Sequence, residues 1–274
     1  MSVSQSDKAV RFRALHEAPG AFVIPNPWDA GSARILAALG FLALATSSGA
    51  SAGSLGRRDG KVTREEALAH SRAIVDATDL PVSADLEKCF ADAPVAAAET
   101  IRLAASVGLV GCSIEDATGD TQKPLFDTAA ATERVTAAVA AARSVGFPFT
   151  LTARTESFLR GNPDLDDVIR RLQAFEKAGA DVLMAPGLPD LAAVRAVCAA
   201  VKKPVNFMVG IKGKSFTAAE LTAAGVKRIS LASSLYRSAM NGLIDAAREV
   251  KGSGTFGYVD RGVTSAELSG FMEG

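Results

Sequence analysis

The chain has 274 residues, of which 48% are hydrophobic and 22% are charged, so it can bury a large core. Lysine plus arginine and aspartate plus glutamate number 30 each, and this balance argues against nucleic acid or an anionic membrane surface as a partner. Cys89, Cys112 and Cys198 fit no zinc or disulfide spacing, and no apolar run resembles a membrane span or a secretory leader, so a reduced, cytoplasmic setting is predicted.

A helix over residues 7–18 opens the chain, with His16 expected on a solvated edge. After it, an apolar strand followed by a helix recurs eight times. Strands are predicted at Ala21–Pro25, Leu42–Thr46, Val82–Asp85, Val110–Ile114, Pro148–Ala153, Asp181–Met184, Val205–Val209 and Arg228–Leu231. Helices are predicted at Ala30–Leu39, Thr63–Ala77, Pro94–Val107, Thr128–Val145, Leu165–Ala178, Asp190–Ala200, Thr217–Ala224 and Leu235–Lys251. Residues 47–61 are expected to form a loop of small residues.

The strands are continuous apolar runs, as is typical of parallel strands that are covered on both faces. Eight of them alternating with helices predict an α/β fold, a single closed (β/α)₈ TIM-type barrel over residues 1–274. A helical tail is expected from about residue 252, with a short helix over Thr264–Met272. Glycines that can take the left-handed conformation of a helix end follow five helices, at Gly40, Gly108, Gly146, Gly179 and Gly225.

In a barrel of this kind the functional residues lie at the carboxyl ends of the strands. Asp85 and Glu87 end the third strand one residue apart, so in extended backbone their side chains point the same way. Alone, such a pair can be two solvated acids, but Glu115 ends the fourth strand and Asp59 lies in the loop after the second. Carboxylate oxygens suit Mg²⁺, with Mn²⁺ as an alternative. We therefore predict a divalent metal held by Asp85, Glu87, Glu115 and Asp59, in part through water.

Polar residues that end other strands predict a substrate site beside this metal. Residues 47–49, Ser-Ser-Gly, offer accessible backbone N–H groups that suit a substrate carboxylate. The Arg154 guanidinium fits a carboxylate or an enolate oxygen, although it can also serve only to neutralise the acids. The set indicates a small α-oxo or 2-hydroxy acid as substrate, with the metal stabilising a developing enolate. The residues assigned to substrate binding are Ser47, Ser48, Gly49, Asp59, Arg154 and Asn206, and those assigned to catalysis are Arg154 and Glu115.

Five segments of the chain occur in the order found in the isocitrate lyase / phosphoenolpyruvate mutase superfamily, which the chain resembles from about residue 12 to residue 236. They are TSSG (46–49), LGRRDG (55–60), SADLE (83–87), SIED (113–116) and TARTE (152–156). The resemblance implies a barrel whose last helix is exchanged with a neighbouring subunit, in a homodimer or homotetramer. It also implies Mg²⁺ at Asp85, assisted through water by Glu87, Glu115 and Asp59, with Ser47 to Gly49 on the substrate carboxylate and Arg154 on an enolate-like intermediate.

The chain departs from this superfamily in its loops. The isocitrate lyases have a K-[KR]-C-G-H segment after the fourth strand, whose cysteine donates a proton, whereas residues 116–124 contain no cysteine or histidine. Where the family often has a glycine–aromatic–glycine turn, residues 88–91 read Lys-Cys-Phe-Ala, and Cys89 is expected to be a small apolar filler. His16 and His70 fall in outer helices, so histidine acid–base chemistry is not expected. Arg171 is expected on a solvated helix face.

These observations favour a Mg²⁺-dependent carbon–carbon lyase or decarboxylase that acts on a small α-oxo or 2-hydroxy (di)carboxylate through an enolate. Solvent can protonate that enolate, so the missing cysteine is dispensable. The first alternative is phosphorus–carbon chemistry, as in a phosphonopyruvate hydrolase or phosphoenolpyruvate mutase, for which Lys123 is the nearby cation. The second alternative is a protein that binds an α-oxo acid, such as 2-oxoglutarate, or oxalate, with little turnover.

Overall fold

The eight predicted strands are present and form one parallel, barrel-shaped sheet. The structure is a computed structural model that describes residues 3–273. Adjacent strands are hydrogen-bonded in the order β1-β8-β7-β6-β5-β4-β3-β2, and the Ala45 N–H donates to the Pro25 carbonyl over 3.0 Å, which links the second strand to the first. The predicted (β/α)₈ barrel is therefore confirmed. The strands are β1 (Phe22–Ile24), β2 (Leu44–Ala45), β3 (Val82–Asp85), β4 (Gly111–Glu115), β5 (Thr150–Arg154), β6 (Val182–Met184), β7 (Val205–Met208) and β8 (Arg228–Ser230).

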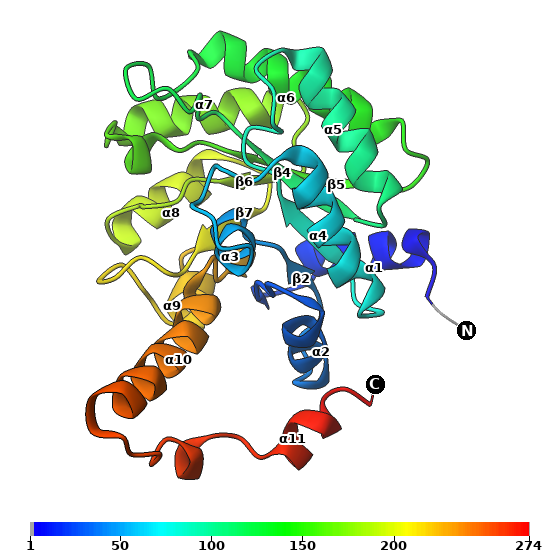
Figure 1. The fold of residues 1–274 in the computed structure, drawn as a ribbon. Helices are drawn as coiled ribbons and strands as arrows, with labels where there is room; N and C mark the ends of the chain where they lie inside the picture. The colour runs from blue at the N-terminus through cyan, green and yellow to red at the C-terminus, as the bar shows by residue number, and fades with distance from the viewer. Residues whose placement is uncertain (1–2, 274) are drawn as a thin grey trace.

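Helices surround the sheet, and the main core lies between the two layers (Figure 1). The helices are α1 (Gln5–Glu17), α2 (Ala30–Ala38), α3 (Ser48–Ser54), α4 (Arg64–Asp76), α5 (Pro94–Ser106), α6 (Thr128–Arg143), α7 (Leu165–Lys177), α8 (Leu191–Ala200), α9 (Ala218–Ala223), α10 (Ser234–Ser253) and α11 (Ser265–Gly270), with short 3₁₀ turns η1 (Ser157–Arg160) and η2 (Val259–Arg261). A second, smaller core forms where Phe12 of α1 packs with Ile24 and Val110. The first helix therefore closes the end of the barrel where these strands begin.

Local sequence signals explain where the elements begin and end. Thr63 caps α4 and Glu66 bonds back to it, as the spacing of these residues predicts. All five glycines expected at helix ends have φ between 83° and 101°. At Gly108 a side chain is excluded as well, because a Cβ there would lie 2.6 Å from Val75 Cγ1. The chain can therefore turn sharply from helix to buried strand at these points.

The expectation that residues 47–61 form a loop is wrong for the first half of that segment, which is helix α3. The Ser47 hydroxyl accepts a hydrogen bond from the Ala50 N–H over 3.4 Å and caps the helix. Small residues let this helix approach α10 closely, since a Cβ at Gly53 would lie 2.7 Å from the Tyr236 ring. Close packing against a distant element, which no local pattern reveals, therefore stabilises the helix.

Two side chains expected at the surface are buried. His16 does not lie on a solvated edge, because its ring packs edge-on against Phe12 and Phe22 at centroid distances of 4.8 and 5.0 Å. Arg171 does not lie on a solvated face either, because its guanidinium bonds Asp116 at 3.1 Å and Asp167 at 2.9 Å in the interior. In both cases a tertiary partner outweighs the polarity of the side chain.

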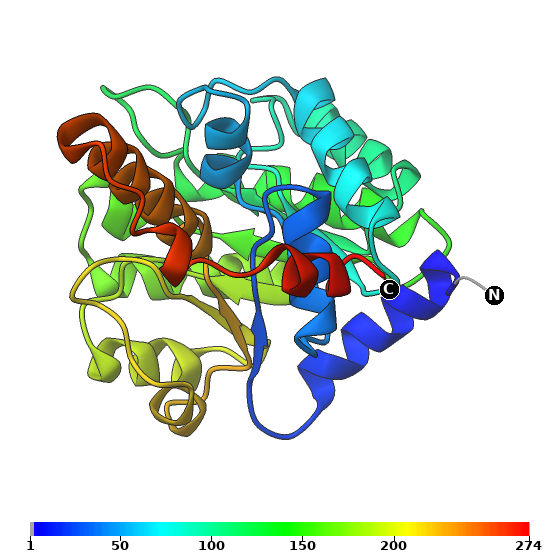
Figure 2. The same cartoon turned by 60° about the horizontal axis from the view of Figure 1, so that its bottom comes forward.

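Helix α10 leaves the barrel instead of packing along it (Figures 1 and 2). It has no buried residue, and Leu243 and Ile244 are 61% and 45% exposed. The tail then returns to α2, where Arg34 Nη1 donates to the Met272 carbonyl over 2.8 Å (Figure 2). Among residues 3–273, no helix combines the length and the apolar character that crossing a membrane requires.

Candidate active site

A cavity of about 620 Å³ opens where β3, β4 and β5 end. It receives side chains from several loops and strand ends, which the fold brings together from positions far apart in the sequence. The residues predicted for the site that line this cavity are Ser47, Ser48, Gly49, Asp59, Asp85, Glu87, Glu115 and Arg154. Asn206 does not line it: its amide lies below and bonds Arg228 and Ser230.

The Asp85 carboxylate is held in place from three sides. Its Oδ1 accepts hydrogen bonds from the Ser113 hydroxyl at 3.2 Å and the Glu87 N–H at 3.3 Å. Its Oδ2 accepts from the Ser48 N–H at 3.3 Å. Asp59 approaches from the loop after β2 and lies close over Gly49, where a Cβ would be a tight 3.3 Å from Asp59 Oδ2. Backbone and hydroxyl donors therefore orient Asp85 toward the cavity, as is usual around metal-binding carboxylates.

The loop after β3 is strained and is fixed by a buried arginine. Glu87, Cys89 and Phe90 have φ of 50°, 59° and 56°, the left-handed region that costs a non-glycine residue about 1–2 kcal/mol. Arg134 of α6, 2% exposed, satisfies the carbonyls of this loop and of the next strand end. Its guanidinium donates to the carbonyl of Lys88 and, at 2.8, 3.1 and 3.1 Å, to those of Ala91, Asp92 and Glu115. One cation thus fixes the backbone that carries both Glu87 and Glu115.

Cys89 is the buried filler that the sequence predicts. The side chain is completely buried, and its Sγ lies 3.8 Å from the Ser113 carbonyl. Burial raises the pKa of this thiol to about 12. The thiol is therefore neutral and does not line the cavity, so it is not an acid for the chemistry of the site.

Arg154 is surrounded by carboxylates. Its Nε lies 2.5 Å from Glu156 Oε1 and 3.6 Å from Glu115 Oε2, and its Nη1 lies 3.9 Å from Asp85 Oδ2. Burial alone would lower the pKa of Arg154, but Glu156, Glu115 and Asp85 together raise it above its ordinary value. A second arginine, Arg160, reaches the same acids from η1, at 3.5 Å from Glu156 and 3.9 Å from Glu115. The Arg154 guanidinium therefore stays charged at the cavity wall, and Arg160 lies beside the same acids.

The acids outnumber these two arginines, and the pKa values of two of the acids, Glu87 and Glu115, are raised. Burial, followed by the charges of Asp85 and Asp59, raises the pKa of Glu87 to about 7. Burial also raises the pKa of Glu115 to about 8, against the opposing effect of Arg154. A divalent cation among these oxygens would restore the charged forms, so the donor set fits Mg²⁺ or Mn²⁺. In the part of the chain that the structure describes, no three histidine, cysteine, aspartate or glutamate side chains are arranged so that they could hold a metal ion jointly.

Neighbouring polar residues have structural roles. Asp116 accepts hydrogen bonds from the Thr155 hydroxyl and the Glu156 N–H, both at 2.8 Å, and pairs with Arg171. It thereby joins the ends of β4 and β5. Sequence reasoning missed Arg160, Lys61 and Arg228, of which the first two line the cavity. None of the three ends a strand, so a search for polar residues at the carboxyl ends of strands does not find them.

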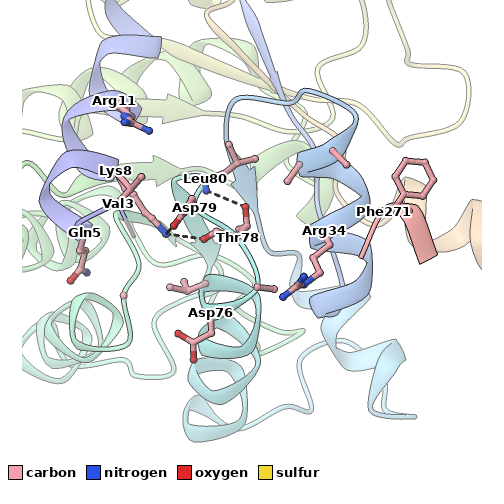
Figure 3. Close-up of a pocket in the computed structure, with 16 residues that line it drawn as sticks. Val3, Gln5, Lys8, Arg11, Arg34, Asp76, Thr78, Asp79, Leu80 and Phe271 are labelled. Carbon is pink, nitrogen blue, oxygen red and sulfur yellow. Dashed lines mark hydrogen bonds and ion pairs between the residues drawn. The ribbon is translucent and has the colours of Figure 1, made fainter. Parts of the chain in front are cut away.

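A second cavity, of about 770 Å³, lies at the other end of the barrel between α1, α2, α4 and the tail (Figure 3). Lys8 and Arg34 point toward it beside Asp79, and Phe271 covers one side. Lys8 Nζ already donates to the Thr78 carbonyl at 2.8 Å and lies 3.7 Å from Asp79. Catalytic groups of this fold lie at the carboxyl ends of the strands, so the smaller cavity is the candidate active site.

Comparisons with known proteins agree with this architecture. A model of the phosphoenolpyruvate phosphomutase family matches residues 12–251. A crystal structure from Burkholderia cenocepacia J2315, described as a candidate lyase/mutase, is 50% identical with a TM-score of 0.97 over 98% of each chain. The 2-methylisocitrate lyase of Escherichia coli K12 is 30% identical over 88% of this chain and 82% of its own. A crystal structure of 2,3-dimethylmalate lyase is 28% identical with a TM-score of 0.87, over 97% of this chain and 94% of that one. The chain therefore belongs to the phosphoenolpyruvate phosphomutase family, within the isocitrate lyase / phosphoenolpyruvate mutase superfamily, and is an enzyme of that type.

Proposed function

We propose that the protein is a Mg²⁺-dependent lyase or decarboxylase that cleaves a carbon–carbon bond in a small α-oxo or 2-hydroxy (di)carboxylate. The observation that carries this proposal is the convergence of Asp59, Asp85, Glu87 and Glu115 with Arg154 in one cavity. Relatives named as 2-methylisocitrate and 2,3-dimethylmalate lyases cleave substrates of this class and support the proposal.

Each side chain has a task in such a reaction. Asp85, with Glu87, Glu115 and Asp59, would hold the metal, which when bound supplies positive charge to the oxygens of an enolate. The backbone N–H groups of residues 48–49 are placed at the cavity wall for a substrate carboxylate. Arg154 stays charged and lies beside Asp85 and Glu115, where its guanidinium can stabilise an enolate oxygen. Glu115 lines the cavity 3.6 Å from Arg154, where its carboxylate can accept a proton from the substrate.

The loop after β4 supplies no cysteine or histidine as a proton donor. Residues 117–125 form a closed turn, with a bridge between Ala117 and Leu125, and Ala117 and Gly119 line the cavity. The turn contains neither cysteine nor histidine, and Cys89 is buried and neutral. Protonation of the enolate by solvent, as in a decarboxylation, is therefore favoured over a reaction that needs a cysteine acid.

The test is turnover by the purified protein with Mg²⁺ on oxaloacetate, 2-methylisocitrate, 2,3-dimethylmalate and phosphonopyruvate. Release of pyruvate with CO₂ or a second carboxylic acid is the expected result. Tight binding of oxalate or 2-oxoglutarate without turnover would instead support an α-oxo acid binding protein. Failure of all four compounds to react or to bind in the presence of Mg²⁺ or Mn²⁺ overturns the proposal.

Phosphorus–carbon chemistry is the second candidate, because the cavity holds more cations than predicted. Lys61, Lys88 and Arg160 all line it, whereas Lys123, the residue expected to meet a phosphoryl group, is exposed and does not. Lys88 is engaged with Asp92 at 2.6 Å and Arg160 with Glu156, which leaves Lys61 as the side chain best placed for a phosphonate. Release of phosphate from phosphonopyruvate, lost in Lys61→Met, would select this reaction.

We further propose that two or four chains assemble through α10, as the resemblance implies. The helix has no buried residue, yet it carries Leu243 and Ile244 on its surface, followed by Phe256, which is 61% exposed. Apolar residues gathered on the exposed surface of a helix are typical of a surface that another chain covers. Sedimentation should give a dimer or tetramer, and Leu243→Glu should shift it toward monomer, whereas Asp245→Glu should not. A monomeric native chain contradicts the proposal.

A further inference from the structure

The floor of the barrel contains a buried arginine with no acidic partner. Arg228 begins β8 and is 5% exposed. Its Nε donates to Asn206 Oδ1 over 2.8 Å, and the Asn206 amide donates in turn to the Ser230 hydroxyl over 3.0 Å. Its Nη1 is also buried but has no hydrogen-bond partner within residues 3–273. An unpaired donor on a buried cation is costly, so such a group needs an anionic or polar partner.

Among residues 3–273, no carboxylate forms an ion pair with Arg228, although Asp85 lines the same pocket. Burial lowers the pKa of Arg228 to about 10, and no carboxylate within the described residues opposes this effect. His16 lies near enough for Arg228 to affect it, but burial and the arginine's charge lower the pKa of His16 to about 3, so the ring is neutral. Arg154, in contrast, forms ion pairs with three carboxylates.

Arg228 lines a small pocket that continues from the floor of the active-site cavity. This floor pocket has a volume of about 40 Å³ and shares Ser47, Asp85 and Arg154 with the cavity above it. Five hydroxyl side chains line it, those of Thr46, Ser47, Ser83, Ser113 and Ser230, together with the Asp85 carboxylate and the apolar side chains of Met184 and Met208. A single water needs about 10–15 Å³ in such a space, so the pocket has room for one group the size of a carboxylate. The Ser230 oxygen accepts from Asn206, which leaves its proton available to a ligand.

We infer that the floor pocket is an anion subsite, in which Arg228 and Ser230 bind one carboxylate of a small dicarboxylate whose reacting end lies among the acids above. This inference rests on the proposed function and narrows it, because a monocarboxylate such as pyruvate would leave the subsite without its anion. Asn206, predicted to bind substrate, is then a positioning residue that orients the guanidinium through Nε. Charge-assisted hydrogen bonds from a desolvated guanidinium are among the strong ones, so the second carboxylate should contribute substantially to affinity.

The test compares two probes by calorimetry on the full-length protein with Mg²⁺: the dicarboxylate 3,3-difluorooxaloacetate and the monocarboxylate pyruvate. In the native protein the dicarboxylate should bind more tightly. In Arg228→Met this preference should fall about 10- to 100-fold, as expected for loss of a hydrogen bond to a charged group, while pyruvate affinity stays within about twofold. Arg228→Lys keeps the charge and should retain part of the preference. Arg195→Met, which removes an exposed arginine of α8, is the matched control and should retain all of it.

The outcomes separate this inference from the proposed reaction. An unchanged preference in Arg228→Met, with normal turnover, overturns the subsite and leaves the reaction standing. An Arg228-dependent preference without turnover of any substrate supports the subsite and overturns the reaction. Should Arg228→Met fail to fold, Arg228→Lys decides: full preference for the dicarboxylate, unchanged from the native protein, overturns the subsite.

Discussion

Two arginines of the barrel interior, Arg154 and Arg228, lie in opposite electrostatic settings. Arg154 ends β5 among Asp85, Glu115 and Glu156, and these acids exceed the local positive charge. Arg228 begins β8 beneath them, and within residues 3–273 its guanidinium is hydrogen-bonded to the amide of Asn206. The end of the barrel where Asp85, Glu115 and Arg154 lie, here called its mouth, therefore favours a cation. The floor pocket around Arg228 favours an anion. A dicarboxylate that lies between them is oriented by charge before any reaction begins, which is how positioning lowers a barrier.

Removing the central acid of the mouth should have the largest effect. In Asp85→Asn the carboxylate that three donors orient becomes neutral, so we expect loss of Mn²⁺ binding and at least about a 10³-fold fall in kcat/KM. Titration with Mn²⁺ and steady-state kinetics check this. Asp76→Asn, on the exposed face of α4, is the control and should bind Mn²⁺ normally. Activity that survives Asp85→Asn would falsify the metal role of the mouth.

The next largest effect is expected at Arg154. In Arg154→Lys the charge remains, but the fork that reaches several acids and the substrate is lost, so kcat should fall about 10²–10³-fold while the protein stays folded. Arg143→Lys is the matched control, since Arg143 pairs with Asp181 away from the cavity at 2.6 Å. If kcat is unchanged and only stability falls, Arg154 neutralises the acids and takes no part in catalysis.

A smaller effect on the same mouth is expected from Arg134, which does not line the cavity. Arg134→Met leaves buried carbonyls of the strained loop without donors, so we expect about 3 kcal/mol lower unfolding free energy. Because Glu87 and Glu115 then lose their fixed backbone, Mn²⁺ affinity should fall about tenfold or more. Denaturant unfolding and Mn²⁺ titration measure the two effects. Arg102→Met on the surface of α5 should change neither, and loss of stability with native Mn²⁺ affinity contradicts the positioning role.

The mouth could be predicted from the sequence far better than the floor. Asp85, Glu115 and Arg154 each end a strand, and parallel strands of a barrel bring their carboxyl ends to one place. Arg228 begins its strand, and only the fold shows that its partner is the amide of Asn206. Arg160 lies on a 3₁₀ turn four residues after Glu156, a spacing that has no meaning until the acids have been located. The strand pattern in the sequence therefore identifies residues at strand ends. Which charged side chains become neighbours inside the barrel depends on how the chain packs, and the sequence pattern does not predict it.

The smallest expected effect concerns stability at low pH, and it tests whether His16 of α1 is buried beside the positive charge of Arg228. His16 has a pKa of about 3 in the folded protein, against about 6.5 unfolded, because it is buried and faces the positive charge of Arg228. Between these values the unfolded chain binds more protons, so this histidine lowers stability as pH falls below 6.5 and has no such effect above it. In His16→Leu this contribution disappears. From pH 6.5 to pH 4 the native protein should therefore lose about 3 kcal/mol more unfolding free energy than the variant.

Urea unfolding at both pH values gives this difference, and equal losses in the two proteins would mean that His16 is open to solvent. Since a protonated His16 would face an uncompensated Arg228, filling the floor pocket with a dicarboxylate should reduce the same pH dependence.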